Sequence, residues 1–243
     1  MMKLAVAQID SPQRWLCYQH RMRLLASIAV VALCVAACGQ PPAPTATGPT
    51  ASSSAPVHVQ PANIAKVRGD LPAGYEVAGI AGRTAPASAW GFGRGWTAEP
   101  PQCAALADPV TDGAVTRGWS ASGGGGIVNA VVTGSPGAAV GLDHALIAEC
   151  AQWNLSAGHT SGDVTFAAAP DIDGVATVGL STAITTVVEG GTQTRAHADT
   201  FIAYLGDYVA FVTVVTDPGS PNPPLGQDFA AELLVKTVSA LRG

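Results

Sequence analysis

Three side chains that can carry charge or move a proton occupy alternate positions in one predicted strand, residues 192–205. Arg195, His197 and Asp199 are spaced two residues apart, and side chains two apart on a β-strand project from the same face. A cation, a base and an acid on one surface would bind a polar or anionic group. The same spacing is typical of the solvated side of an amphipathic strand, and this second interpretation is the one we favour.

A second set of candidates is aromatic. Trp90, Phe92, Trp96 and Trp119 fall within 30 residues, in a glycine-rich part of the chain. Aromatic walls with few charges suit an apolar ligand cleft, but a small domain also uses tryptophan to fill its core. Core packing is our first interpretation, and a ligand wall is the alternative.

The sequence contains none of the common motifs that would identify a catalysed reaction. Residues 118–122 lack the second glycine of the G-x-S-x-G nucleophile motif, and the glycines of residues 91–95 do not form a phosphate-binding loop. The sequence has no H-E-x-x-H, no C-x-x-C and no EF-hand spacing. We therefore expect a protein that is not an enzyme and has no catalytic residue, metal or cofactor. A hydrolase with dispersed residues, led by His197 and Asp199, is the alternative.

The N-terminal region has the pattern of an export signal. Residues 24–36 form an uncharged apolar run preceded by Arg14, Arg21 and Arg23. The run is shorter than the roughly 20 residues of a membrane-spanning helix and fits the core of a signal peptide. Residues 35–39, Val-Ala-Ala-Cys-Gly, resemble the lipobox of bacterial lipoproteins. This resemblance implies cleavage after residue 37 and attachment of diacylglycerol to the sulfur of Cys38; the sequence leaves open whether translation starts at Met1, Met2 or Met22.

Residues 38–61 follow as a tether rich in Pro, Thr and Ser and free of charged residues. Such a segment buries too little apolar surface to order itself, so we expect an extended linker and leave its O-glycosylation open. From Cys38 onward the chain has 8 Lys and Arg against 16 Asp and Glu, a net charge of −8. With this excess of acidic residues the chain has no basic surface to neutralise phosphates, which excludes nucleic acid as a partner. Anionic headgroups would also repel it, so we expect membrane attachment to come from the lipid on Cys38.

Residues 62–243 are predicted to form one folded domain. Two cysteines, Cys103 and Cys150, remain after the tether, and an even pair in an oxidising compartment predicts one disulfide. Apolar residues at positions 142, 146, 150 and 153 form one stripe of a predicted helix over residues 141–153.

The other elements are predicted to be mainly strands. We expect strands at 75–80, 117–122, 127–133, 164–168, 177–188, 192–205 and 208–216. The last three are joined by turns too short for parallel crossovers, so they must be antiparallel. Positions 230, 234, 238 and 241 form the inward stripe of a closing helix. The predicted fold is α+β: a twisted antiparallel sheet of about five to six strands, covered by two main helices of which one is C-terminal.

Several motifs in this domain resemble a known group of proteins. They are Leu-Pro-Ala-Gly-Tyr at 71–75, Trp-Gly-Phe-Gly at 90–93, Pro-Gln-Cys-Ala-Ala-Leu at 101–106 and Arg-Gly-Trp-Ser at 117–120. Together they resemble mycobacterial exported lipoproteins of unknown function with a sensor-type domain. These proteins are more distantly similar to the extracellular sensor domain of the receptor kinase PknH, which implies a twisted antiparallel sheet with helices bordering a cleft. Lipoproteins with a PsbP-like sandwich share the element pattern of residues 192–241.

These patterns predict a lipoprotein on the extracytoplasmic face of the cell membrane, with a non-catalytic binding or sensor-type domain. We expect its ligand to be an amphiphilic envelope molecule or an exported partner protein. An envelope hydrolase, or a lipoprotein that only recruits another protein, are the alternatives.

Overall fold

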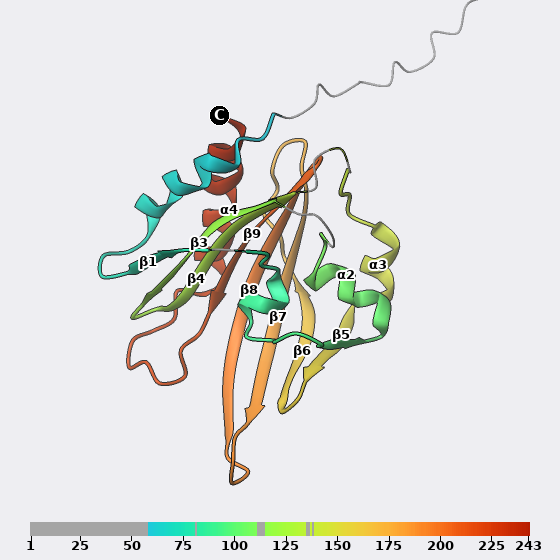
Figure 1. Cartoon of the computed structure of the whole chain (residues 1–243), viewed down its shortest axis with the longest axis vertical. Coiled ribbons are helices and arrows are strands. Elements are labelled where there is room, and N and C mark those ends of the chain that lie inside the picture. The colour runs from blue at the N-terminus through green and yellow to red at the C-terminus, as the bar shows by residue number, and fades with distance from the viewer. Residues whose placement is uncertain (1–57, 81, 111–114, 135–136, 138) are drawn as a thin grey trace, which may run out of the picture. The chain divides into compact units, whose positions relative to one another are not determined.

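The computed structural model describes residues 58–80, 82–110, 115–134, 137 and 139–243 (Figure 1). The predicted signal peptide, Cys38 and almost all of the tether lie outside this part of the chain. In the part described, no helix combines the length and the apolar character that crossing a membrane requires.

The domain is built on one antiparallel sheet of nine strands, in the order β1-β3-β4-β9-β8-β7-β6-β5-β2. The strands are β1 (Glu76–Gly79), β2 (Thr97–Glu99), β3 (Val115–Gly123), β4 (Gly126–Gly134), β5 (Gln152–Ala157), β6 (Thr160–Ala167), β7 (Ala176–Val187), β8 (Gln193–Leu205) and β9 (Tyr208–Val215). All seven predicted strands are present, and the antiparallel pairing of the last three is confirmed. The prediction of about five to six strands in the sheet was too low: all seven predicted strands join this one sheet, and two more, the three-residue β2 and β5, have no counterpart among the predicted strands.

One face of the sheet is covered by α4 (Gly226–Arg242) and the 3₁₀-helix η1 (Pro61–Asp70). The apolar stripe predicted for the C-terminal helix is confirmed, since Ala230, Leu234, Val238 and Leu241 are all buried. They pack against β8 and β9 in a core that also contains Trp119 from β3. Figure 1 shows η1 beside α4 on the same side of the sheet. These elements cover the half of the sheet that contains β3, β4, β9 and β8.

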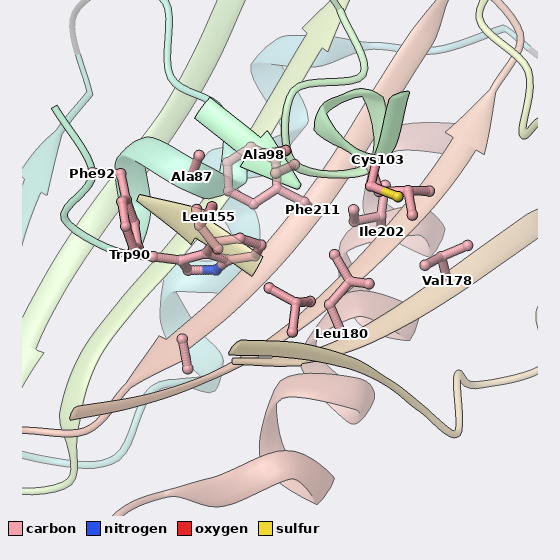
Figure 2. Packing of buried hydrophobic residues seen from close by; sticks show 14 of the residues in the cluster. Ala87, Trp90, Phe92, Ala98, Cys103, Leu155, Val178, Leu180, Ile202 and Phe211 are labelled. Carbon is pink, nitrogen blue, oxygen red and sulfur yellow. The ribbon is translucent and has the colours of Figure 1, made fainter. Parts of the chain in front are cut away.

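The opposite face is covered by short helices and irregular chain. These helices are α1 (Pro86–Ala89), η2 (Pro101–Cys103), α2 (Ala104–Ala107) and α3 (His144–Glu149). They pack over a second core that includes residues of β5 to β9, such as Leu155, Ile202 and Phe211 (Figure 2). The predicted disulfide is present: Cys103 and Cys150 are joined and both are fully buried.

The predicted helix over 141–153 is shorter in the structure. It spans only His144–Glu149, and the chain then enters β5 with Trp153 and Leu155 buried. The positions 142, 146, 150 and 153 fit a helical stripe, but from residue 152 onward the period of two belongs to a strand. The second of the two predicted main helices is therefore a short helix of six residues, held at its end by the disulfide.

Candidate functional site

The two covering layers are offset, and this leaves half of one sheet face open. Beyond the edge of α4, the face of β2, β5, β6, β7 and the first half of β8 has no helix packed on it among the described residues. Strand register places fourteen side chains on it, which we call the open polar face: Thr97, Glu99, Gln152, Asn154, Ser156, Ser161, Asp163, Thr165, Ser181, Ala183, Thr185, Arg195, His197 and Asp199. Ala183 alone among them is non-polar, and all except Asp199 are exposed or half-buried.

Arg195, His197 and Asp199 lie on this face, as their alternate spacing predicts. His197 Nε2 is 3.0 Å from Asp199 Oδ1, and the two side chains are 43% and 10% exposed. Ser181 of β7 lies directly across from Asp199 in the strand register. Its Oγ is 3.3 Å from the same His197 Nε2. The sequence did not identify this serine, because cross-strand neighbours depend on register.

The electrostatics of the group favour a charged histidine. The hydrogen bond to Asp199 raises the pKa of His197 above its ordinary value, and partial burial opposes this only in part. The backbone of His197 is held as well, since its N–H donates to Thr216 Oγ1 at 2.8 Å and its carbonyl accepts from Thr216 N. Arg195 is exposed and makes no side-chain bond to any described residue, so it does not join the pair.

The arrangement of Ser181, His197 and Asp199 does not match a nucleophilic relay. In such a relay the acid binds one ring nitrogen and the other nitrogen takes the proton of the serine. Here Asp199 and Ser181 both face Nε2. When Nε2–H donates to Asp199, this nitrogen has no lone pair to accept the serine proton. The geometry therefore suits binding of a polar group better than activation of a nucleophile.

A hollow of about 600 Å³ lies at the other end of the open polar face, against β2, β5 and β6. Six polar side chains line it, two from each strand: Thr97, Glu99, Asn154, Ser156, Ser161 and Asp163. Pro101 and the intervening residues complete the lining. Its volume falls in the range of small-molecule sites, about 300–1,000 Å³, but such sites are mostly apolar and this lining is polar.

Two pairs of side chains in the hollow are bonded to each other. With its amide oriented to satisfy its neighbours, Asn154 Nδ2 donates to Asp163 Oδ1 at 2.8 Å. Thr97 Oγ1 and Ser156 Oγ are 3.3 Å apart. Sequence reasoning missed the whole hollow, although the alternation of polar and apolar residues from 152 to 156 is a strand signal. Among the described residues, no group of three His, Cys, Asp or Glu is placed to hold a metal ion.

The aromatic candidates do not form one wall. Trp90 and Phe92 are each 3% exposed and belong to the core beneath the short helices, where Trp96 packs at the margin. Trp119 is fully buried in the core on the other face of the sheet. The indole nitrogens of two of them are bonded inside the protein: Trp90 Nε1 donates to Thr200 Oγ1 at 2.7 Å and Trp119 Nε1 to Ile64 O at 2.9 Å. These contacts agree with core packing, the first interpretation of the aromatic residues.

By its fold, this protein is an α+β domain with a nine-stranded antiparallel sheet, and one face of the sheet is open and polar. Residues 60–242 match a family described as a domain of unknown function, DUF5642, and the chain belongs to this family. The X-ray structure of an uncharacterised protein from Mycobacterium smegmatis shares the fold. That protein is 21% identical, with a TM-score of 0.58, and the match covers 78% of this chain and 100% of that chain.

The extracellular domain of PknH from Mycobacterium tuberculosis is also similar, at 15% identity and a TM-score of 0.42, with 76% of this chain and 92% of that chain covered. No curated protein matches. The resemblance to mycobacterial proteins of unknown function is confirmed.

Proposed function

We propose that this chain is a lipid-anchored, extracytoplasmic binding domain without catalytic activity, and that its ligand contacts the open polar face. The observation that carries the proposal is this face itself. Five neighbouring strands present polar side chains on one uncovered surface, hollowed at one end. The apolar residues of the same strands are packed in the core behind it. A ligand therefore meets hydrogen-bonding groups held on a rigid sheet.

The disulfide supports the proposed compartment. Disulfides persist in oxidising compartments outside the cytoplasm and are rare inside it. Cys103 and Cys150 bond in the folded domain. The apolar run at 24–36 supplies the export signal, and the lipobox-like residues at 35–39 supply the anchor at Cys38.

The absence of catalysis is supported by the contacts of His197. Asp199 and Ser181 share one ring nitrogen, so the histidine is placed to hold a charge or a hydrogen-bond partner. We now propose a polar ligand in place of an amphiphilic one. Trp90, Phe92 and Trp119 are buried in the two cores and cannot form an apolar wall for a ligand.

Native mass spectrometry of a soluble form beginning at Gly39, expressed with an export signal and purified from cell envelope, tests the proposal. We expect a bound mass that is lost on denaturation. If the open polar face is only a solvated surface, the spectrum will show the mass of the chain without a ligand. This result would contradict the proposal. Turnover of an ester or glycan panel that His197→Ala abolishes would contradict its non-catalytic part.

A further inference from the structure

We propose that the hollow over β2, β5 and β6 binds a neutral carbohydrate. This inference rests on the proposed function and adds the chemical class of the ligand and its place on the open polar face.

The hydrogen-bonding groups of the hollow match those of a sugar. Glu99 and Asp163 end in carboxylates, which only accept hydrogen bonds when ionised. Asn154 can donate and accept, and so can the three hydroxyl groups of Thr97, Ser156 and Ser161. A sugar hydroxyl also donates and accepts, so a polyhydroxylated ligand can satisfy both kinds of group at once. A ligand made only of acceptors would leave the carboxylates without partners.

The charge of the hollow excludes anionic ligands. Its lining contains two carboxylates and no Lys or Arg. Arg195 is the nearest basic residue in the cross-strand row of Ser161. It lies two strands away, with Thr185 between them, so the two Cα atoms are about 10 Å apart at the usual strand spacing, and Arg195 is not part of the lining. A phosphate, a nucleotide or an acidic sugar would therefore meet repulsion without a counter-charge.

Internal bonds orient the polar groups before a ligand arrives. The bond from Asn154 Nδ2 to Asp163 Oδ1 fixes the direction of the amide, and Thr97 and Ser156 restrain each other in the next row along the strands. This preorganisation lowers the entropy lost on binding. Since the lining contains no aromatic ring on which a sugar could stack, we expect free oligosaccharides to bind weakly, with a Kd on the order of 1 mM. The envelope ligand must bind more tightly to be retained during purification, and further contacts with the open polar face supply this affinity.

An NMR titration of the ¹⁵N-labelled soluble form tests the inference. Maltopentaose and mannopentaose are the neutral probes, trigalacturonic acid is the anionic probe and spermidine is the cationic probe. We expect at least one neutral probe to shift the amide signals of residues 97–99, 154–156 and 161–163, and the anionic probe to leave them unchanged. Asn154→Ala should weaken the binding at least tenfold. Ser239→Ala, on the exposed side of α4 and away from the open polar face, should not change it.

The inference is overturned if neither neutral sugar shifts these signals far above millimolar concentration, or if the anionic probe shifts them equally. Tighter binding of spermidine would identify a cation site and would also overturn it. Asp163→Asn keeps the shape of the hollow, so it provides a second variant if Asn154→Ala fails to fold. If these results exclude a sugar but the protein purified from cell envelope still carries a bound mass, only the carbohydrate inference is wrong and the proposed function stands.

Discussion

Two buried threonines on neighbouring strands differ in their hydrogen bonds. Thr200 of β8 accepts from the Trp90 indole and lies 2.8 Å from the Thr213 hydroxyl. Thr182 of β7 is equally buried, but its hydroxyl has no partner among the described residues. Thr200→Val should lower the free energy of unfolding by about 1–3 kcal/mol, because it leaves buried polar groups unpaired. Denaturant unfolding monitored by tryptophan fluorescence measures this change.

Thr182→Val is the matched control for that substitution. It removes a hydroxyl that forms no bond, so it should leave stability unchanged or raise it by about 1 kcal/mol. Equal destabilisation by both substitutions would mean that Thr182 has a hydrogen-bond partner in the folded protein.

The pair formed by His197 and Asp199 predicts a pH dependence. The folded pKa of His197 is raised, chiefly by its hydrogen bond to Asp199. The stabilising effect is therefore present below the unfolded pKa of about 6.5 and is lost as the pH rises through the folded value. Asp199→Asn should lower the pKa of His197 in an NMR titration of the ring. Because the histidine is 43% exposed, the loss of stability should be below about 1 kcal/mol and larger at pH 5.5 than at pH 8.

Ser156→Ala, three strands away on the same face, should leave the pKa of His197 unchanged. A His197 pKa that does not fall in the Asp199→Asn variant would contradict the assigned cause of the shift.

At the residue scale, strand alternation predicted that Arg195, His197 and Asp199 share a face, and they do. Alternation did not predict Ser181 as their neighbour, because the pairing of β7 with β8 depends on the register of the whole sheet. Alternation also did not predict that Trp119 lies in a different core from Trp90 and Phe92. Which face of a strand is buried depends on the helices that pack on the sheet.

At the scale of elements, α4 should be stabilised mainly by its buried stripe. Leu234 is fully buried and Val235, the next residue, is 40% exposed. Leu234→Ala should cost about 2–5 kcal/mol through lost contacts and a cavity. Val235→Ala should stay within about 0.5 kcal/mol. Thermal and denaturant unfolding compare the two variants, and similar losses would contradict the packing described for this helix.

The disulfide links η2 to the end of α3. It joins residues 47 apart in the sequence, so the chain-entropy treatment gives about 4 kcal/mol of stabilisation. The double substitution Cys103→Ala and Cys150→Ala should lower the free energy of unfolding by about 2–4 kcal/mol. Wild-type protein unfolded in a reductant should show a similar loss, and no difference in either experiment would contradict a structural role for the bond.

Periodicity predicted the long elements well and the short ones poorly. The 12 and 13 residues of β7 and β8 repeat their pattern many times, whereas β2 has three residues and no repeat to detect. Around residue 150, a few apolar positions fit both a helix and a strand. The hollow falls on β2 and β5, the strands that the sequence did not reveal, and this explains why it was missed.

At the scale of the whole molecule, the two covering layers are offset across the sheet. One core lies under α4 and η1, and the other under the short helices on the opposite face. Sequence patterns predict which residues are apolar, but the division of the short helices and α4 between faces follows from three-dimensional packing. The open polar face is a consequence of this offset.

The proposed anchor makes a separate prediction. Metabolic labelling with an alkyne analogue of palmitate should mark the wild-type protein, and Cys38→Ser should remove the label and release the protein from the membrane fraction. Label of equal intensity in the variant would contradict lipid attachment at Cys38.

Binding at the open polar face is tested most directly by blocking it. Ser161 is exposed in the hollow, and Ser239 is exposed on α4, away from the open polar face. Native mass spectra of Ser161→Trp and Ser239→Trp, purified from cell envelope alongside wild type, compare the two surfaces. We predict that the bound mass is lost from the Ser161→Trp variant alone; its retention in this variant, or its loss only from Ser239→Trp, would contradict the proposed binding face.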